Sequence, residues 1–600
     1  MLIPVIQPKP EPPLFVSTSA GVEFAAGFFG EEQDGPYKFR WTEMHAILEF
    51  EAASDLRFLE CGLMSEFGDL SQVVSVTVGA ETRVCPLPHG WTPFSIPVPA
   101  GATTAVLKAN KRFPGEYHAG DNRILAIRVR DVRLHADPER HRAIALQHDN
   151  STLNQKELLA GQTSLTSTPP SLGIDLHGVC NVKPPCVYCE WDFSKNLEGE
   201  RADVPFTRET LKEWGPFFDN TSTLINCSIG EPFMMKNLNE LLEIFGRTGK
   251  TVQMTTNGQI LTDRNIQNLV GMPIDLYVSL DAATPETYAK LRNNTFDKLV
   301  ANLRRLVIAK GGRGKMPYVH MVFMPMRCNL HELEDFVRLA ADVGADRLVL
   351  RPLNYSEGVA LDWERAGHRF VYQEELLPFD ELVKASGRAA RLSKRLGVEL
   401  ADQMDFGGSM RDLFQEDFDA DAPADAAAAA AEAPKPAPQP EPQAAAPVPA
   451  SAPAPALDPA PVPAMPAALP SIGREKAPAC LEPWKSLYIL RRGVLPCCYG
   501  GAPLAPMEDY RKVWNSPEVQ AIRGELLQGR FHDYCLKSPA CPIVRKSEHA
   551  GLLPVGQRVT LQGRHVWHRL NHLTNDRLNK FVGTPVKRAR RTIAQWFGQA

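Results

Sequence analysis

The sequence lacks the features of a membrane-spanning or secreted protein. No run of eighteen apolar residues occurs in its 600 residues, so no transmembrane helix is expected. The first residues, MLIPVIQPKPEPP, lack the basic region that opens a secretory signal, and we expect a cytoplasmic protein. Charge of one sign is not in excess either. The chain has 66 Lys and Arg against 70 Asp and Glu, a net charge of −4, so no nucleic-acid partner is expected.

Alanine and proline, by contrast, are abundant between residues 421 and 470, where they fill 36 of 50 positions. Such a segment has too little apolar side-chain surface to fold, and we interpret it as a disordered linker at the end of a connector over 401–470. It separates a large upstream part from a segment over 471–550 and a basic tail over 551–600. A chain of this length is expected to hold several domains.

Residues 1–140 are expected to form a β-sandwich, followed by a connector over 141–170. Runs rich in β-forming residues, separated by turn residues, lie at 46–52, 73–80, 104–110 and 124–134. Trp41, Trp91 and Tyr117 suit either the core of such a domain or stacking on sugar rings.

Residues 171–400 alternate between strand-like and helix-like patterns. The strand-like runs are mostly apolar and lie at 172–178, 223–230, 252–258, 274–282, 318–325 and 347–353. Asn329 and Glu332 are spaced as a capping box before the helix that Gly344 ends. Six βα units with apolar strands indicate an α/β fold, a partial (β/α)6 TIM barrel, with its chemistry at the carboxyl ends of the strands.

Three cysteines follow the first of these strands directly. They are Cys180, Cys186 and Cys189, in the segment GVCNVKPPCVYCEW. Three thiolates can bind three irons of a 4Fe-4S cluster and leave the fourth iron open, whereas structural zinc normally takes four protein ligands. The residue types favour an open cluster, with zinc as the alternative.

Further motifs follow the next strands. SIGEP ends with Gly230, Glu231 and Pro232, TTNG occupies 255–258, and VSLDAATPETYAKLR occupies 278–292. With the cysteines, these motifs resemble the radical S-adenosylmethionine (SAM) superfamily over about residues 171–400. The loop between the first two cysteines has five residues, where the family usually has three.

The resemblance implies a set of cofactor contacts. The three cysteines would bind a 4Fe-4S cluster whose fourth iron is chelated by SAM, and Tyr188 would pack near the adenine. The turn of Gly230, Glu231 and Pro232 would receive the SAM amino group. Three residues of the motif at 278–292 would also reach SAM, namely Ser279, Asp281 and Arg292. Each also has a structural interpretation, as a helix cap, a charge at a helix N-terminus or a core residue.

A second group of cysteines follows the linker. Five thiols lie within 62 residues, at Cys480, Cys497, Cys498, Cys535 and Cys541. This segment resembles the SPASM domain, whose cysteines bind auxiliary 4Fe-4S clusters in radical SAM enzymes that modify peptides, proteins and some sugars. The resemblance implies one auxiliary cluster bound by Cys480, Cys535, Cys541 and one of the adjacent pair, of which we favour Cys497. A zinc site of four cysteines is the alternative.

The basic tail allows two interpretations. Residues 561–600 contain eight Lys or Arg and one acid, with apolar residues between them. The tail suits a helix docked on its own domain better than contact with a membrane surface or a partner.

Taken with these motifs, the resemblance implies a radical SAM enzyme. It would cleave SAM to a 5′-deoxyadenosyl radical and abstract hydrogen from a peptide, protein or carbohydrate, giving oxidation, a crosslink or epimerisation. An external electron donor such as a flavodoxin or ferredoxin would be a partner. The alternative is a non-catalytic zinc- or iron-sulfur-binding scaffold with a carbohydrate-binding N-terminal domain.

Overall fold

The structure is a computed structural model. It describes residues 21–34, 37–67, 69–88, 90–114, 123–189, 206–228, 230–353, 362–402, 480–498, 500, 502–538, 541, 543–544, 547 and 556. The expected linker over 421–470 and nearly all of the tail over 551–600 lie outside the described residues.

The N-terminal part is one antiparallel sheet, where we expected the two sheets of a sandwich. Seven of its eight strands form the path β5-β4-β7-β2-β10-β3-β6, and the eighth, β1, pairs with β2 beside this path. The sheet curls until its end strands β5 and β6 lie against each other, so it is nearly closed. The strands are β1 (Val22–Asp34), β2 (Tyr37–Phe50), β3 (Arg57–Met64), β4 (Val73–Val78), β5 (Glu81–Pro86), β6 (Thr92–Val98), β7 (Thr104–Ala109) and β10 (Arg128–His135), with the short pair β8 (Phe113–Pro114) and β9 (Ile124–Leu125) beside them.

The interior of this sheet holds its apolar side chains, in line with the alternating pattern. Leu48, Val74 and Leu107 are buried in one core cluster together with Cys61 and Cys85. Trp41 is 1% exposed and packs with Phe39, so of its two interpretations the structure supports the core position. Tyr117 lies outside the described residues.

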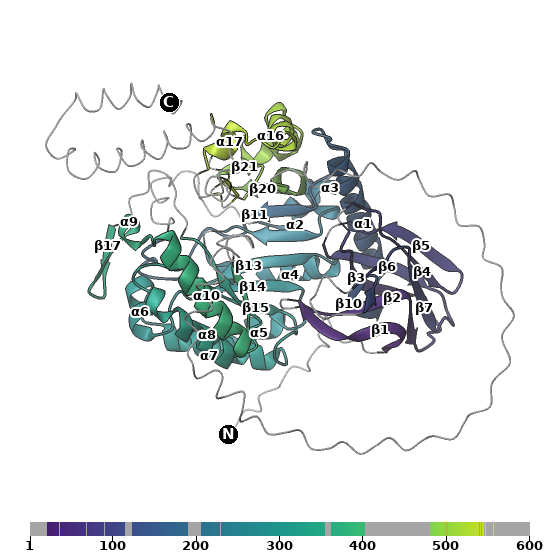
Figure 1. Cartoon of the computed structure of the whole chain (residues 1–600), viewed down its shortest axis with the longest axis horizontal. Helices are drawn as coiled ribbons and strands as arrows, with labels where there is room; N and C mark the ends of the chain where they lie inside the picture. The colour runs from purple at the N-terminus through teal and green to yellow at the C-terminus, as the bar shows by residue number, and fades with distance from the viewer. Residues whose placement is uncertain are drawn as a thin grey trace, which may run out of the picture.

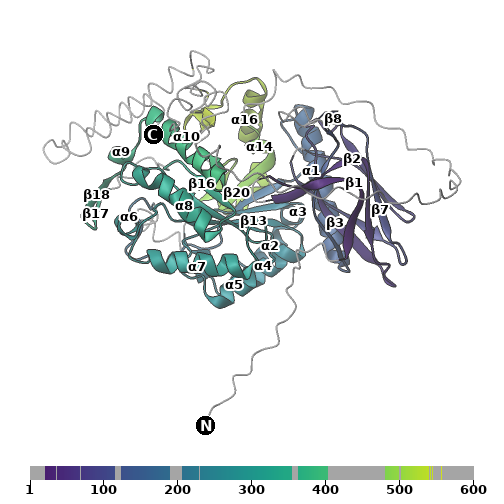
Figure 2. The same ribbon diagram turned by 60° about the horizontal axis from the view of Figure 1, so that its bottom comes forward.

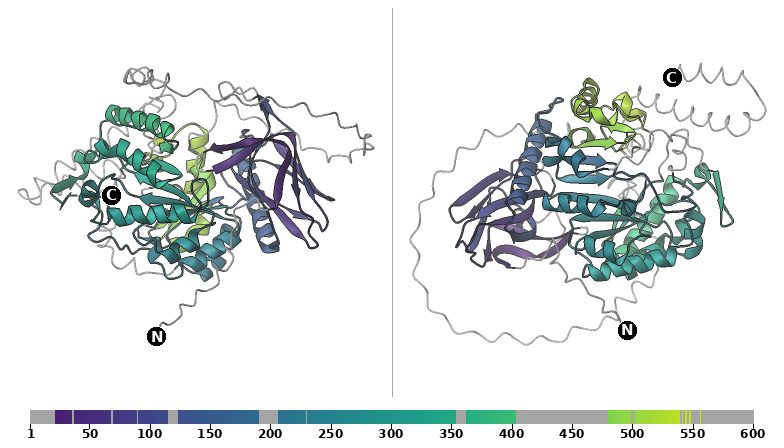
Figure 3. Two further views of the ribbon diagram at one scale, coloured as in Figure 1. Left: turned by 90° about the horizontal axis from the view of Figure 1, so that it is seen from below. Right: turned by 180° about the vertical axis from the view of Figure 1, so that it is seen from behind.

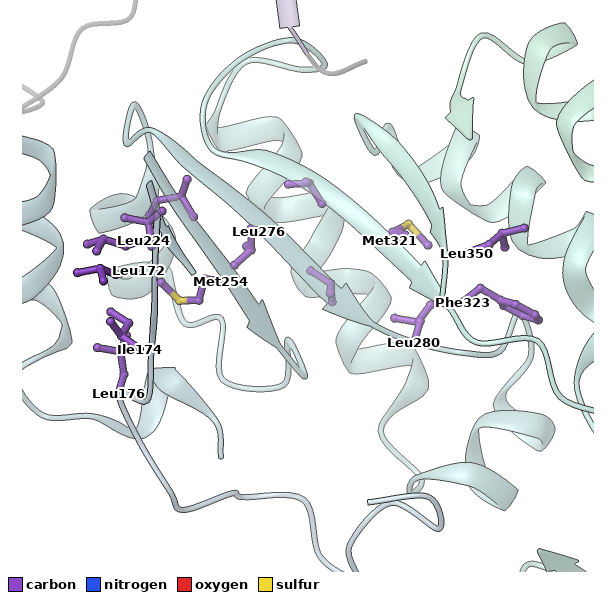
Figure 4. Packing of buried hydrophobic residues seen from close by; sticks show 14 of the residues in the cluster. Leu172, Ile174, Leu176, Leu224, Met254, Leu276, Leu280, Met321, Phe323 and Leu350 are labelled. Carbon is purple, nitrogen blue, oxygen red and sulfur yellow. The ribbon is translucent and has the colours of Figure 1, made fainter. Parts of the chain in front are cut away.

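The second part confirms the six parallel strands of the barrel. Their order in the sheet follows the chain, and each pairs in parallel with its neighbour. They are β11 (Ser171–Ile174), β12 (Thr223–Asn226), β13 (Thr251–Thr256), β14 (Ile274–Ser279), β15 (Tyr318–Phe323) and β16 (Arg347–Leu350). Figure 4 shows apolar side chains of these strands packed together, among them Leu172, Leu224, Met254, Leu276, Met321 and Leu350.

Two further strands extend this sheet at its ends. β19 (Glu399–Asp402) adds to β16, and β20 (Ser486–Leu490) adds to β11, both in parallel. β20 then turns back into β21 (Gly493–Leu495). The part of the chain after the linker therefore joins the barrel sheet beside the strand that leads to the first three cysteines, as Figure 1 shows at the top of the molecule.

Helices cover the outer face of the barrel, as Figure 2 shows. They are α2 (Arg208–Trp214), α3 (Pro216–Asp219), α4 (Leu238–Arg247), α5 (Asp263–Leu269), α6 (Pro285–Leu291), α7 (Phe296–Ala309), α8 (Leu333–Val343) and α10 (Phe379–Arg395). The predicted apolar face of α8 is buried, and Gly344 ends the helix at φ 78°. Glycine suits this position because the left-handed conformation crowds a Cβ atom.

The capping box predicted before α8 is absent. Asn329 precedes a short 3-10 helix, η4 (Leu330–Glu332), and makes no side-chain cap bond there. Its amide nitrogen donates to the backbone oxygens of Asp281 and Met324, at 2.9 and 3.0 Å. The Glu332 carboxylate accepts bonds from Ala283 N and the Thr284 hydroxyl. Both side chains therefore hold the loop after β14, because their tertiary partners outcompete the local cap.

The segment after the linker shares the core of the barrel. Its helices are α14 (Glu482–Lys485), α15 (Tyr510–Trp514), α16 (Pro517–Leu527) and α17 (Asp533–Leu536). Trp484, Trp514 and Val519 belong to the same buried cluster as Leu172 and Leu224 of the barrel. The described residues after 480 thus pack as part of the barrel body.

The N-terminal sheet packs against the opposite end of the barrel strands, near where they begin. The Tyr37 hydroxyl donates to the Asp275 carboxylate at 3.0 Å, and Asp275 lies next to the start of β14. Helix α1 (Pro138–Leu159) lies between the two parts, as both views of Figure 3 show, and its Arg140 binds Glu60 of β3 at 2.6 Å. The sheet is therefore remote from the carboxyl ends of the barrel strands.

Deleting most of residues 421–470 should leave expression, melting temperature and SAM cleavage close to those of the parent. The composition predicts that this segment connects β19 to β20 and makes no contacts that stabilise the fold. Thermal melts and a SAM cleavage assay of the shortened chain check this. A fall in the melting temperature of more than a few degrees would mean that the segment is ordered and contributes to stability.

None of the helices in the described part of the chain is both long and apolar enough to cross a membrane.

Candidate functional site

The residues expected to bind the first cluster and SAM lie after β11 and β12, at the end of β14 and in the segment that follows it, up to Arg292 after α6. The strands are parallel, so these segments meet at one edge of the sheet. The expected location at the carboxyl ends of the strands therefore agrees with the structure.

The loop that carries Cys180, Cys186 and Cys189, called the cysteine loop below, follows β11 and contacts side chains from neighbouring segments. The amide of Asn257 lies 3.8 Å from the Cys180 sulfur, and the Arg292 guanidinium lies 3.5 Å from the Cys186 sulfur. The Cys189 N–H donates to the Cys186 carbonyl at 2.9 Å. Burial raises the pKa of the Cys186 thiol, and the positive charge of Arg292 opposes this rise.

Gly230 brings the loop after β12 against the cysteine loop. A Cβ atom at this position would lie 2.5 Å from the backbone oxygen of Val179. The next residue, Glu231, donates its N–H to that same oxygen at 2.8 Å. Glycine is therefore required sterically at position 230, which is a structural reason for the motif.

Glu231 is 1% exposed and ties three segments together. Its carboxylate accepts bonds from the Thr256 hydroxyl and the Asn257 N–H, both at 2.7 Å, and from the Phe233 N–H at 3.2 Å. Burial raises its pKa, while these hydrogen bonds act in the opposite direction. Pro232 is buried and begins the 3-10 helix η3 (Pro232–Met234). Glu231 thus has the structural role of a cap, and its contact with SAM stays a prediction.

Asp281, Arg292 and Tyr188 form one buried network. Asp281 is 0% exposed, and its Oδ2 accepts bonds from the Tyr188 hydroxyl at 2.5 Å and from Arg292 Nη2 at 2.7 Å. Its Oδ1 accepts the Met324 N–H at 2.8 Å. Burial lowers the pKa of Arg292, but the nearby charges of Tyr188, Cys186 and Asp281 outweigh this and raise it overall. The network fixes the Arg292 side chain beside the cysteine loop.

Two atoms at this edge remain open to a further partner. Arg292 is 4% exposed, and its Nε has no hydrogen-bond partner in the described part of the chain. Ser279, at the end of β14, is half-buried, and its hydroxyl makes no hydrogen bond to the described residues. A buried donor without a partner is costly, so an acceptor group bound here would satisfy Arg292.

Sequence reasoning missed the positioning residues of this site. Asn257 belongs to the TTNG motif, and its place after β13 could have identified it. Asn329 carried no such signal, because its bonds to the loop after β14 depend on the tertiary fold.

The chemistry of the three thiols after β11 suits a cluster with one open iron. In the described chain, only one group of three potential ligand atoms lies within 4.8 Å of one another, and it contains none of the eight cysteines expected to bind metal. A tetrahedral zinc ion with Zn–S bonds of about 2.3 Å needs sulfurs roughly 3.8 Å apart. A 4Fe-4S cluster is larger and binds thiolates that are farther apart. Cys180, Cys186 and Cys189 provide three thiols from one loop, which is the donor set that can bind three irons of a 4Fe-4S cluster.

The cysteines after the linker also gather. The charge of Cys480 interacts with those of Cys541 and Cys535, and the charge of Cys498 interacts with those of Cys497, Cys541 and Cys480. Cys498 is exposed and the other four are half-buried. Burial raises the pKa of the Cys480 and Cys535 thiols to about 12. The structure brings all five together.

Comparisons with known proteins agree with this site. The family model of the radical SAM superfamily matches residues 174–340. A UPF0026 protein of Synechocystis is 32% identical over 126 residues, which cover 20% of this chain and 47% of that protein. A probable GTP 3′,8-cyclase of Saccharolobus islandicus is 27% identical over 188 residues, covering 30% of this chain and 56% of that protein. The chain thus spans about half the length of these relatives.

Among solved structures, Streptococcus suis SuiB bound to S-adenosylmethionine aligns with a TM-score of 0.41 and 14% identity, covering 66% of this chain and 77% of that one.

The cofactors of the matched family are a 4Fe-4S cluster and SAM, and the three cysteines after β11 lie inside the matched range. Residues 174–340 of the chain therefore carry a radical SAM domain.

Proposed function

We propose that the protein cleaves SAM reductively and uses the product to abstract hydrogen from a substrate. Cys180, Cys186 and Cys189 would hold the cluster. When bound and reduced by an external donor such as a flavodoxin or ferredoxin, this cluster supplies one electron that splits SAM into methionine and a 5′-deoxyadenosyl radical. The single observation that carries the proposal is the convergence of these cysteines with Asn257 and Arg292 at the carboxyl edge of the barrel.

The protein's own residues would bind and orient the cofactors. Arg292, fixed by Asp281 and Tyr188, has a free Nε that can donate to the SAM carboxylate. Ser279 offers a second hydroxyl at the same edge. Glu231 and Gly230 hold the loops after β12 and β13 in place against the cysteine loop. This arrangement positions the reacting groups, and positioning is the main contribution that a protein makes to cofactor chemistry.

The proposal is tested by anaerobic reconstitution of the full chain with iron and sulfide. With dithionite and SAM, the protein should release 5′-deoxyadenosine and methionine in equal amounts, measured by liquid chromatography and mass spectrometry. A protein that carries the cluster but forms no 5′-deoxyadenosine under these conditions would contradict the proposal.

For the substrate we propose a peptide or protein, with a carbohydrate as the second candidate. The exposed side chains of Val179 and Met234 flank the cysteine loop and the turn after β12, at 39% and 38% exposure. An apolar rim favours contact with a peptide side chain over a sugar. The remote position of the N-terminal sheet also weakens the idea that it presents a sugar to this edge. Candidate peptides are tested with deuterium at the hydrogen that would be abstracted. If the radical removes that hydrogen, deuterium should appear in the 5′-deoxyadenosine that is released.

A non-catalytic zinc scaffold is the alternative interpretation of the sequence. We favour the cluster because Cys180, Cys186 and Cys189 lie inside the range that the radical SAM family model matches. We also propose that the cysteines after the linker bind one auxiliary 4Fe-4S cluster, which would accept an electron from the substrate or bind it.

The auxiliary cluster gives a prediction about iron content. The parent should hold about eight irons, and the variant with Cys180, Cys186 and Cys189 changed to alanine should keep about four, because each site would hold one 4Fe-4S cluster. Adding Cys535→Ala and Cys541→Ala should remove most of the remainder. Iron analysis and Mössbauer spectra measure this.

The adjacent pair supplies a control for this experiment. Cys497→Ala and Cys498→Ala should differ, with the larger iron loss marking the true ligand. A barrel triple variant that contains only zinc, or no metal, would contradict the auxiliary cluster and leave the SAM chemistry untouched.

A further inference from the structure

A group of potential metal ligands lies beside the cysteine site and belongs to neither cluster. Cys328, His368 and Glu375 bring a thiol, an imidazole nitrogen and a carboxylate oxygen within 4.8 Å of one another. They come from the loop after β15, the first residue of β18 (His368–Val371) and the last residue of α9 (Tyr372–Glu375). Three distant segments of chain therefore meet at one point.

The contacts inside this group are centred on Glu375. Its Oε1 is 2.8 Å from His368 Nε2, and its Oε2 accepts the Cys328 N–H at 2.9 Å. Burial, and after it the charge of Glu375, raises the pKa of the Cys328 thiol. The Arg327 side chain donates to the backbone oxygens of Glu374 and Leu376, so the backbone on both sides is fixed.

Glu375 is a buried acid whose ion-pair partner in the described part of the chain is a histidine. Its side chain is 5% exposed, and in the described part of the chain it forms an ion pair with His368 alone, with no lysine or arginine. His368 is 23% exposed, so the group can be reached from solvent. A buried carboxylate is costly unless it is paired with a cation or binds a metal.

We propose that Cys328, His368 and Glu375 bind a Zn²⁺ ion. Thiolate and imidazole ligands suit zinc and do not suit Mg²⁺ or Ca²⁺, which prefer oxygen. Ligand atoms within 4.8 Å of one another need only a small inward shift to reach Zn–S bonds of about 2.3 Å and Zn–N and Zn–O bonds of about 2.0 to 2.2 Å. On binding, the thiol proton is released and the bond between His368 and Glu375 is replaced by bonds to the metal.

The ion would stabilise the packing of a β-hairpin, formed by β17 (Asp362–Arg365) and β18, against the proposed SAM site. Among the described residues, the strands β17 and β18 pair with each other and with no further strand. An isolated two-stranded hairpin is marginally stable. From this hairpin, Arg365 donates to the backbone oxygen of Arg292 at 2.8 Å, and the ring of Phe370 lies 6.3 Å from that of Tyr188. Zinc binding at this site does not depend on the proposed SAM chemistry. The ion would nevertheless stabilise the hairpin that contacts Arg292 and Tyr188.

The test uses the full chain with its clusters reconstituted. It is dialysed anaerobically against Zn²⁺ and desalted, and zinc and iron are measured by mass spectrometry. The parent should retain one more zinc per chain than the Cys328→Ser and His368→Gln variants, whose zinc affinity should fall at least about 10-fold. His331→Gln is the matched control, because His331 follows Cys328 by three residues, is 68% exposed and lies outside the group. It should keep the parent's zinc.

Zinc bound equally by the parent and by both ligand variants would overturn the proposal, and so would a parent that retains none. X-ray absorption at the zinc edge should show one sulfur and two or three nitrogen or oxygen ligands. A shell of three or four sulfurs would mean that zinc had entered the cluster cysteines, which also overturns it. Iron content and SAM cleavage are measured on the same samples, so failure here is distinct from failure of the proposed function. If Cys328→Ser does not fold, the more exposed His368→Gln decides.

Discussion

Changing Cys180, Cys186 and Cys189 together to alanine should reduce SAM cleavage to background, at least about 10³-fold below the parent, which corresponds to roughly 4 kcal/mol at 1.36 kcal/mol per tenfold. The loss should be this large because no other described residue at the carboxyl edge could supply the electron that the reaction needs. Binding of SAM by Arg292 and Ser279 alone would leave an intact, unreacted molecule. Release of 5′-deoxyadenosine under dithionite is the measurement.

Cys227→Ala is the matched control. Cys227 directly follows β12, packs beside Tyr488 and Leu490, and belongs to neither proposed ligand set. It should keep nearly the parent's activity. A triple variant that forms 5′-deoxyadenosine as fast as the parent would mean that the cluster lies elsewhere.

Changing Arg292 to methionine should produce the second large effect, a loss of about 10- to 100-fold in SAM cleavage, as is typical when a residue that supports a metal ligand is removed. The guanidinium donates to the Cys186 sulfur at 3.5 Å and pairs with buried Asp281 at 2.7 Å. Its removal takes a positive charge and a hydrogen bond away from a cluster ligand, so the cluster becomes harder to reduce.

The readout that separates this role from a merely structural one is the reduction potential. It should become more negative in Arg292→Met, measured by redox titration of the barrel cluster. The reduction potential of Arg292→Lys should lie between those of the parent and Arg292→Met. Lysine keeps the positive charge but lacks the forked guanidinium that reaches both the Cys186 sulfur and the Asp281 carboxylate. Arg304→Met should match the parent, since Arg304 is 51% exposed and pairs with Asp342 on the surface. An unchanged potential in Arg292→Met would contradict this role.

Much of the barrel could be predicted from the sequence, because its strands are apolar on both faces and its helices carry a regular apolar stripe. The six strands and the buried face of α8 follow from these local patterns. The pairing of β20 with β11 could not be predicted, because a long segment of chain separates the two strands and no local pattern encodes the partner. In the N-terminal part, β6 was missed because Pro93 and Pro97 argue against a strand, yet an end strand of a sheet tolerates proline.

The site shows the same limit. Cys180, Cys186 and Cys189, Glu231 and Asp281 were marked by motifs, and the fold brings them to one edge. The internal bonds of Asp281 to Tyr188 and Arg292 were not expected, because they depend on how the loop after β14 lies against the cysteine loop. Cys328 could not be identified as a potential ligand from the sequence, because its partners His368 and Glu375 lie 40 or more residues away.

The most direct test of the account is the electron paramagnetic resonance spectrum of the reduced protein with and without SAM. The sample is the variant Cys535→Ala and Cys541→Ala, in which the barrel cluster should be the one that remains. If three cysteines leave one iron open, addition of SAM should change the g values of the reduced cluster, because SAM becomes a ligand of that iron. A spectrum that is identical with and without SAM would contradict the account.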